Sequence, residues 1–362
     1  MSCVWIRWPL SQHALPRARG RPPSGPNLHT IRRTCAPARI PLVPQPPAPT
    51  PGRLMLLDSA SLCFRAFHGV PESLTAPDGT PVNAVRGFLD AIAHLVATHA
   101  PTRLVACWDD DWRPAFRVAA LPSYKAHRVS PDGGEETPAA LPAQVDVVVE
   151  VLAALGVARV GAPGYEADDV MATLTARAST GSASRPGVPV DVVTGDRDLF
   201  QLVDDAAGVR DVYCGKGVRR ADLVDQAWLA ARYGVASGAA YADVAVLRGD
   251  PSDGLPGVAG IGEKTAAALV GRYGDLAGVL AAAQDPASDL PPAQRRRLLG
   301  AGDYLAAAPV VVATVRDVPL PEVDDALPRE PADPAALEEL VRRWGVGSSV
   351  QRVLTAFTGA PA

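Results

Sequence analysis

The feature that most constrains this chain is a set of short apolar runs that each stop at an acid. The runs 54–57, 104–108 and 190–195 are followed by Asp58, Asp109 and Asp196. Short apolar runs between helical stretches are typical of parallel strands buried on both faces, and in such sheets the ligand site lies beyond the carboxyl ends of the strands. We therefore predict that these acids converge at one edge of a sheet.

The stretches between these runs predict helices. Apolar residues recur at helical spacing over 82–98, over 141–155 and again from about residue 166. After residue 222 the sequence becomes alanine-rich, with glycine-rich turns at 254–262 and 271–274. This pattern favours an α/β fold with a mainly parallel central sheet flanked by helices, followed by a smaller all-helical domain.

The predicted domains are an α/β domain over 53–220, a helical domain over 221–345 and a tail over 346–362. Residues 1–52 stand apart because they are rich in proline and arginine and contain no acid. A disordered basic arm, an arginine-rich organellar transit peptide and a stretch upstream of the true start codon all fit this composition. We expect residues 1–52 to be dispensable for function.

The composition of the chain indicates its cellular compartment and limits its possible partners. The five cysteines are scattered without a CxxC pair, which favours a reducing, cytoplasmic setting over a disulfide framework or a zinc knuckle. No apolar run approaches the roughly 20 residues that span a bilayer, so no membrane partner is expected. The net charge of −4 does not itself indicate a nucleic-acid partner. Any such contact must come from local basic patches.

About thirty residues separate the second apolar run from the helix at 141, and connections this long are usually functional lids or disordered. This segment, near 112–140, is basic, and we predict a mobile arch over the acids, with a solvated loop as the alternative. Its basic residues include Arg113, Arg117, Lys125 and Arg128. Lys125 is one of only three lysines in an arginine-biased chain, which favours a phosphate contact over an ordinary surface role.

Further acids cluster in the sequence, and like charges brought together oppose folding unless cations lie among them. Oxygen ligands without histidine or cysteine favour Mg²⁺ or Mn²⁺ over zinc. Helix capping alone would also explain one or two acids near residue 166. Asp110, Asp111 and Asp191 are interpreted as bystanders. The candidate metal ligands are Asp58, Asp109, Glu166, Asp168, Asp169, Asp196, Asp198, Asp250 and Asp253.

A glycine-rich stretch over 255–266 can expose backbone N–H groups and the start of a following helix to a phosphate. It resembles a helix-hairpin-helix DNA-binding element near 250–275, with a plain turn between packed helices as the alternative. The candidate DNA contacts there are Gly257, Gly260, Ile261, Gly262, Lys264 and Thr265.

Taken together, several segments resemble the successive motifs of the bacterial 5′-3′ exonuclease and flap-endonuclease family, which includes the N-terminal nuclease domain of DNA polymerase I. The resemblance covers about residues 53–320 and implies a PIN-like nuclease core. The segments that carry it are 57–59, 64–67, 124–128, 164–169, 194–199 and 249–266.

The resemblance implies roles for individual residues. One metal ion would lie near Asp58, Asp109, Glu166 and Asp168, and a second near Asp196, Asp198, Asp250 and Asp253, with Asp169 close to both. Lys125, Arg128 and Arg65 would act in catalysis through the substrate phosphate, and Phe64 and Tyr124 would stack on an end base. Hairpin carbonyls around Val258 and Ile261 could hold K⁺.

The function implied is structure-specific 5′-3′ exonuclease and 5′-flap endonuclease activity on DNA by a two-metal-ion mechanism, in replication and repair. The expected partner is DNA with a free 5′ end, bound without sequence preference by a bacterial monomer that works alongside a DNA polymerase and a ligase. Since about forty residues follow the resemblance, we expect a stand-alone nuclease. The alternatives are a nuclease acting mainly on RNA, a catalytically weak DNA-structure-binding protein and a small-molecule phosphatase.

Overall fold

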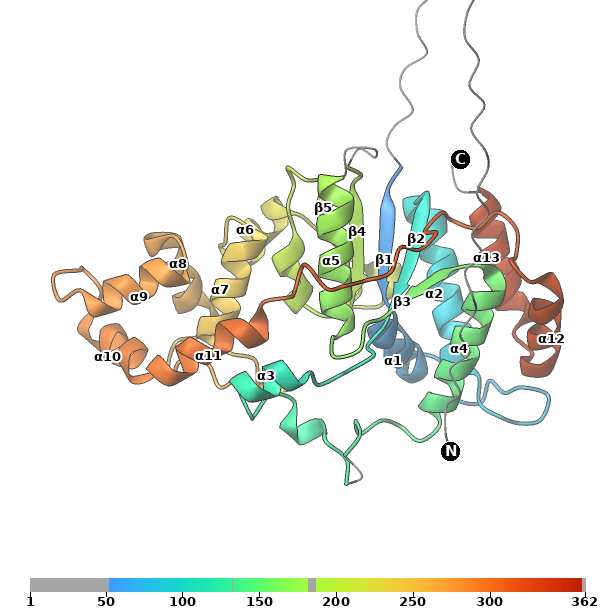
Figure 1. The fold of residues 1–362 in the computed structure, drawn as a ribbon, viewed down its shortest axis with the longest axis horizontal. Helices are drawn as coiled ribbons and strands as arrows, with labels where there is room; N and C mark the ends of the chain where they lie inside the picture. Colours follow the sequence, from blue (N-terminus) through green and yellow to red (C-terminus); the bar gives the residue numbers. More distant parts are fainter. Residues whose placement is uncertain (1–51, 132, 182–186, 360–362) are drawn as a thin grey trace, which may run out of the picture. The chain divides into compact units, whose positions relative to one another are not determined.

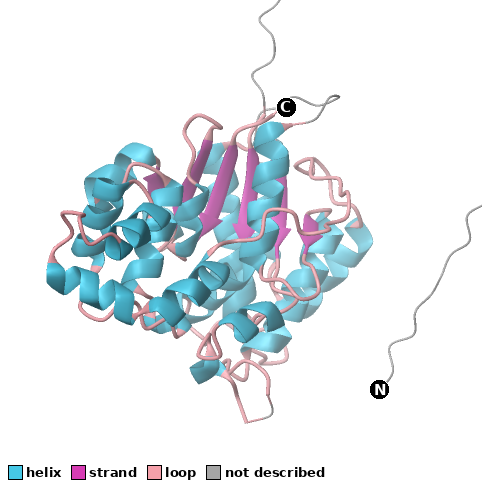
Figure 2. Ribbon diagram, turned by 60° about the vertical axis from the view of Figure 1, so that its left-hand side comes forward, coloured by secondary structure: helices cyan, strands magenta, loops and turns pink. Residues whose placement is uncertain are grey.

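Six strands form one sheet, in the order β3-β2-β1-β4-β5-β6, in a computed structural model that describes residues 52–131, 133–181 and 187–359 (Figures 1 and 2). Every neighbouring pair is parallel except β5 and β6. The predicted extension lies outside the described residues, apart from residue 52. The strands are β1 (Leu54–Asp58), β2 (Arg103–Cys107), β3 (Ala158–Val160), β4 (Val190–Thr194), β5 (Val209–Tyr213) and β6 (Asp222–Val224).

The central strand explains why its sequence is continuously apolar. All five residues of β1 are buried because helices cover both faces of the sheet. Met55 and Leu57 point into one hydrophobic core, while Leu54 and Leu56 point into another. This alternation follows from the two-residue period of a strand.

One face of the sheet packs on five helices, and the other packs mainly on one helix and a short 3₁₀ turn. Figure 1 shows the long helix α2 alongside the C-terminal helix α13, which contact each other. The first set is α1 (Ser59–Gly69), α2 (Asn83–His99), α4 (Leu141–Leu155), α12 (Pro334–Trp344) and α13 (Gly347–Gly359); the second is α5 (Ala167–Thr180) and η2 (Asp198–Leu202).

A third core holds a helical region together. Phe200, from η2, and Tyr124, from the predicted arch, also join this core. Its helices are α6 (Gln226–Tyr233), α7 (Gly238–Arg248), α8 (Glu263–Tyr273), α9 (Leu276–Gln284), α10 (Pro292–Gly300) and α11 (Gly302–Val312). The short elements are α3 (Ala115–Ala120), η1 (Ala126–Arg128), η3 (Val218–Arg220) and η4 (Pro251–Asp253).

The predicted α/β fold with a helical domain is confirmed, but the C-terminal boundaries differ from the prediction. α2 lies within one residue of the predicted helix, and α4 has the predicted bounds. Residues 346–362 were predicted to be a tail, yet most of them form α13, which buries Val350, Val353 and Phe357. α12 and α13 pack on α4 and α2, so the chain returns to the α/β domain after α11.

In the described part of the chain, no single helix is long and apolar enough to cross a membrane. The pair α8 and α9, bent by 84° where they join, passes a test of length and composition when taken together. Buried residues of both helices, among them Leu269 and Val279, belong to the helical core.

Candidate active site

Three candidate ligands lie where neighbouring strands end. Asp58 is the last residue of β1, while Asp109 and Asp196 each lie two residues beyond a strand, β2 and β4 respectively. β1 lies between β2 and β4 in the sheet. The three carboxylates are therefore at the same edge, as the sequence predicts.

These acids are close enough to disturb one another's ionisation. Burial raises the pKa of Asp58, and the charge of Asp196 adds to the effect. Burial also raises the pKa of Asp109 to about 7, with a further contribution from Asp58. Asp168, in the first turn of α5, has its pKa raised well above the usual value by burial and then by Asp196 and Asp58. Such mutual repulsion is the cost that the sequence analysis anticipates.

A second group of acids adjoins Asp196. Burial raises the pKa of Asp198 well above its usual value, and Asp196, Asp253 and Asp250 contribute in that order. Asp250 caps η4 by accepting the backbone N–H of Ser252 at 2.8 Å. The pKa of Asp253 is raised by burial, although neighbouring cations oppose the change.

The predicted arch lies against the remaining acids. The Lys125 ammonium pairs with Glu166, and the Tyr124 hydroxyl donates to both Glu166 oxygens at 2.8 and 2.9 Å. The Arg117 guanidinium pairs with Glu166 and donates two bonds to Asp169, at 2.7 and 2.8 Å. Burial lowers the pKa of Lys125, but Glu166, Tyr124 and Asp253 together outweigh burial and raise it well above its usual value, so this ammonium stays charged.

Arg117 is a functional candidate to which the sequence analysis assigned no role. The side chain is buried, and it also donates to the backbone carbonyls of Val311 at 3.1 Å and Ala313 at 3.4 Å, where α11 ends. One guanidinium therefore joins the arch, the acids and the helical region. The available signal was the basic residue Arg117 in a segment expected to lie over many acids, because arginine is buried almost only where it is paired.

The arch also contacts the turn that carries Asp253. Arg128 pairs with the Asp253 carboxylate at 2.7 Å and donates to the Ser252 carbonyl at 2.8 Å. The backbone N–H of Lys125 donates to the Asp253 carbonyl at 3.0 Å, and the Ser123 hydroxyl donates to the Gly254 carbonyl at 2.7 Å. Both catalytic candidates of the arch are thus bound to acids of the cluster.

The nine candidate metal ligands fall into three groups according to the cationic side chains that lie near them. Asp250 stands apart, with Arg248 and Arg197 at 3.9 and 4.0 Å. The arch-paired acids, which form ion pairs with the arch, are Glu166, Asp169 and Asp253. The unpaired acids, which form no ion pair within the described residues, are Asp58, Asp109, Asp168, Asp196 and Asp198.

Among residues 52–131, 133–181 and 187–359, no three histidine, cysteine, aspartate or glutamate side chains stand ready to hold a metal ion. Three of the nine predicted ligands bind arch cations instead. The donor set nevertheless fits a hard divalent cation, because it consists of carboxylate oxygens whose mutual repulsion a cation would relieve.

Three other predicted substrate contacts have distinct environments. Phe64 is 48% exposed on α1, where its ring forms a T-shaped contact with His68, so the ring is accessible. Tyr124, the other candidate for stacking on an end base, is 4% exposed and donates to Glu166, so its ring is buried in this structure. Arg65 donates to the carbonyls of Gly195 at 2.9 Å and Gly215 at 3.3 Å, so it braces the segment after β4.

The predicted hairpin joins α7 to α8. At Gly257 φ is +67°, and a Cβ would lie 2.2 Å from the Arg248 carbonyl oxygen, so the turn requires glycine. Gly262 caps α8, and both Gly262 and Lys264 are exposed at the start of that helix. A helix N-terminus beside a lysine suits a phosphate.

Three other hairpin candidates, Ile261, Thr265 and Gly260, are buried, half-buried or hydrogen-bonded within the protein. Ile261 is buried in the helical core, and Thr265 is half-buried. The Gly260 carbonyl accepts a hydrogen bond from Arg297 at 2.9 Å. Of the six predicted DNA contacts in the hairpin, Gly260, Gly262 and Lys264 are exposed, and Gly262 and Lys264 lie at the start of α8.

A mainly parallel sheet with acids at its carboxyl edge, followed by a helical domain, is the arrangement of a PIN-like nuclease. Family models agree with both parts of the chain. Residues 53–234 match the 5′-3′ exonuclease N-terminal resolvase-like domain, and residues 236–335 match the 5′-3′ exonuclease C-terminal SAM fold. The chain belongs to the 5′-3′ exonuclease family.

Similar sequences and structures support this assignment. A 5′-3′ exonuclease of Streptomyces coelicolor is 62% identical over 84% of this chain and 100% of its own length, and one of Mycobacterium tuberculosis is 50% identical over 85% and 98%. A DNA polymerase I of Mycobacterium bovis is 41% identical over 77% of this chain and 29% of that protein.

Two solved structures share the fold at low sequence identity. T5 5′-exonuclease, solved with bound divalent metal ions, aligns with a TM-score of 0.55 at 19% identity, over 84% of this chain and 97% of its own. The catalytic core of Rad2, solved with a DNA substrate, aligns with a TM-score of 0.51 at 15% identity, over 85% and 93%.

Proposed function

We propose that this chain hydrolyses phosphodiester bonds in DNA that carries a free 5′ end, at flaps, nicks or gaps. The observation that carries the proposal is the convergence of carboxylates from the ends of β1, β2 and β4 beside a basic arch. The family membership and the DNA substrate in the Rad2 structure support it.

We further propose a dependence on Mg²⁺ or Mn²⁺, with two ions in the active form. The unpaired acids would hold the ions, joined by arch-paired acids once the arch releases them. Bound divalent ions would supply the Lewis acidity that phosphodiester hydrolysis requires. The T5 5′-exonuclease structure, which holds zinc, supports a divalent-ion site, whereas the choice of Mg²⁺ or Mn²⁺ rests on the all-oxygen ligand set.

The arch residues supply the remaining positive charge. Lys125 and Arg128 are cations at the rim of the acid cluster, within reach of a phosphate that enters it. As a phosphate approaches, each cation can exchange its carboxylate partner for a phosphate oxygen and so offset charge that develops in the transition state. Arg117 is more deeply buried, and its proposed role is to position Glu166 and Asp169.

The helical region would grip the duplex without selecting a sequence. Gly262 and Lys264 present backbone N–H groups and an ammonium at the start of α8, and phosphates are the same in every sequence. Affinity should therefore fall steeply with salt. K⁺ bound by the hairpin carbonyls, a monomeric state, a cytoplasmic location and joint work with a polymerase and ligase in replication and repair remain proposals.

The decisive experiment is cleavage of a 5′-labelled flap duplex in Mg²⁺, with a matched RNA flap as the second substrate. Wild type should release short 5′ products from DNA, and Asp196→Asn should lose that activity while Asp303→Asn, at an exposed acid of α11, keeps it. Lys125→Ala should lower the rate without abolishing metal binding. Full activity of Asp196→Asn would overturn the proposed mechanism. A strong preference for the RNA flap would overturn the proposal that the substrate is DNA.

A further inference from the structure

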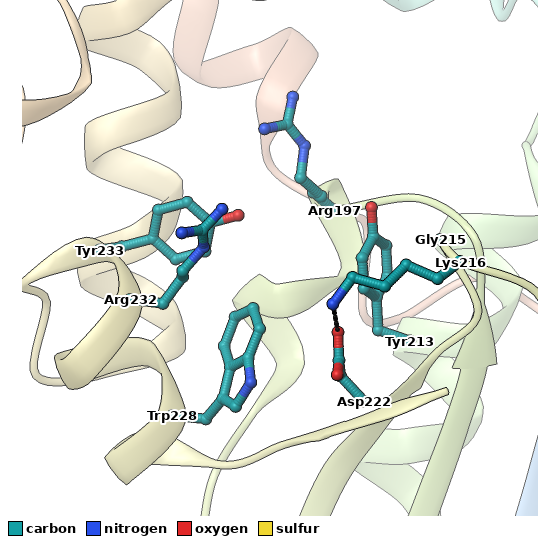
Figure 3. A pocket seen from close by; sticks show the side chains of 8 residues that line it. All are labelled: Arg197, Tyr213, Gly215, Lys216, Asp222, Trp228, Arg232 and Tyr233. Atoms are coloured by element: carbon teal, nitrogen blue, oxygen red, sulfur yellow. Dashed lines mark hydrogen bonds and ion pairs between the residues drawn. The ribbon is translucent and has the colours of Figure 1, made fainter. Parts of the chain in front are cut away.

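A cavity of about 530 Å³ opens where β5, β6 and α6 meet (Figure 3), and its wall includes Arg197, which lies between Asp196 and Asp198 in the sequence. None of the predicted site residues lines it. Its volume lies within the range of about 300–1,000 Å³ that is usual for ligand pockets. Three aromatic and three cationic side chains dominate its wall: Tyr213, Trp228, Tyr233, Arg197, Lys216 and Arg232.

The aromatic rings are fixed in place before any ligand arrives. All three pack on the fully buried Phe200, whose ring centroid lies 5.0 Å from that of Tyr213, 5.6 Å from that of Trp228 and 6.2 Å from that of Tyr233. Each of the three is only half-buried, so part of its surface faces the cavity. In Figure 3, Tyr213 and Trp228 extend from opposite walls.

A glycine makes room for one of these rings. A Cβ at Gly215 would lie 2.4 Å from Cζ of Tyr213, so the ring can follow the wall only because this residue has no side chain. The Gly215 carbonyl in turn accepts the hydrogen bond from Arg65 of α1. The wall is therefore tied to the same segment that carries Asp196.

The charge in the cavity is opposite to that of the whole chain, which is −4. Among the lining side chains, three cations face one carboxylate, Asp222, which pairs with Lys216 at 3.0 Å. Arg232 is exposed and forms no ion pair within the described residues. Arg197 lies between two unpaired acids in the sequence and 4.0 Å from Asp250, so it links the cavity to the active site.

We propose that this cavity binds one nucleotide of a single-stranded segment that leaves the active site. The base would lie against Trp228 and Tyr213, and its phosphate would meet Arg197 and Arg232. Aromatic surfaces can receive a base only when it is unstacked, which favours a single strand over a duplex. The inference rests on the proposed function, since it supplies a further contact for the same substrate.

The test is binding of a short fluorescein-labelled oligothymidylate, measured by fluorescence anisotropy in EDTA with the full chain. Loss of one stacking contact should weaken binding by about 5- to 100-fold in Trp228→Leu. Trp228→Phe, which keeps a ring, should bind nearly as wild type. Arg232→Gln should lower the slope of log affinity against log salt by about 0.7, the share of one phosphate contact. Arg219→Gln, at an exposed arginine outside the cavity, should leave the slope unchanged.

Two further ligands identify the occupant. A blunt duplex should bind Trp228→Leu and wild type equally, and equal loss on both ligands would overturn the proposal. Free dTMP should compete poorly, because it offers one phosphate and no strand. If dTMP competes as well as the oligonucleotide, the cavity is a mononucleotide site and the proposal is wrong.

The measurement is independent of cleavage because it contains no divalent ion. Asp196→Asn should still bind the oligonucleotide through the cavity even though it cannot cut. Unchanged binding by Trp228→Leu, together with normal flap cleavage, would overturn this inference and leave the proposed function intact.

Discussion

The arch-paired acids and the unpaired acids belong to one cluster but differ in what offsets their negative charge. Glu166 and Asp169 receive cations from the arch, and Arg117 binds both of them in the interior. Asp58, Asp109 and Asp168 have no such partners, and their pKa values are raised, chiefly by burial and then by neighbouring acids. Ion pairs offset the charge of the first group, whereas the second group has no ion pair within the described residues to do so.

The difference indicates where a divalent ion would have the larger effect. An ion beside the unpaired acids meets carboxylates that form no ion pair within the described residues, whereas an ion beside the arch-paired acids must displace Lys125, Arg117 or Arg128. We therefore expect the unpaired acids to govern activity and the arch-paired acids to govern stability and arch position. Each of the following substitutions tests one side of this division.

The largest expected effect is on stability, from Arg117→Leu. This change leaves two buried carboxylates without their cation, and breaking a buried ion pair from one side costs about 3–5 kcal/mol. Chemical denaturation of the metal-free protein measures it. Arg342→Leu removes an exposed pair with Glu339 and should change little. If the two variants are equally stable, the arch-paired acids are not held by Arg117.

The opposite signature is expected for Asp168→Asn. Flap cleavage should fall by about 100-fold or more, since a lost metal ligand removes several kcal/mol of transition-state stabilisation. Unfolding of the metal-free variant should be unchanged or require more denaturant, because a repelled acid has been removed. Asp110→Asn, at an exposed neighbour of the cluster, is the control. A variant that loses stability and keeps activity would reverse the division.

Local patterns were sufficient to predict much of this arrangement. Runs that end on acids fixed the edge of the sheet, because strand ends can be recognised from a few neighbouring residues. The helical spacing in 82–98 and 141–155 likewise predicted α2 and α4. The glycine pattern around Gly257 predicted the hairpin, because its positive φ and close backbone approach require glycine.

What the sequence could not predict depends on packing between distant segments. The role of Arg117 arises because α3, α5 and the end of α11 meet in the folded chain. Arg117 and its acceptor Val311 are 194 positions apart in the sequence, so no local pattern predicts their contact. The cavity depends on β5 and β6, which were not predicted as strands, and on Phe200. α13 was assigned to a tail, and its packing on α2 involves a segment about 260 positions away, which no local pattern reveals.

Two buried aspartates within the sheet, Asp191 and Asp211, show the same contrast between a paired and an unpaired acid. Asp191 on β4 is fully buried and pairs with Arg53 and Arg210, both at 2.7 Å, whereas Asp211 on β5 is fully buried with neither oxygen bonded within the described residues. Asp211→Val should raise the free energy of unfolding by about 1–3 kcal/mol, since it removes an unsatisfied buried group. Asp191→Val should lower it. If both variants are destabilised, Asp211 has a partner that the geometry does not reveal.

The same residue gives the smallest effect, a change in how stability depends on pH. Burial, and then Asp58 and Asp196, raise the pKa of Asp211 well above its usual value in the folded chain. The folded state therefore holds an extra proton at moderately acidic pH, and its stability falls as pH rises from about 4 toward the raised pKa. The advantage of Asp211→Val over wild type should be smallest near pH 4 and should grow toward pH 7 in denaturation curves. Asp211→Asn should also abolish this decrease of the unfolding free energy with pH. If the decrease persists in both variants, other acids cause it.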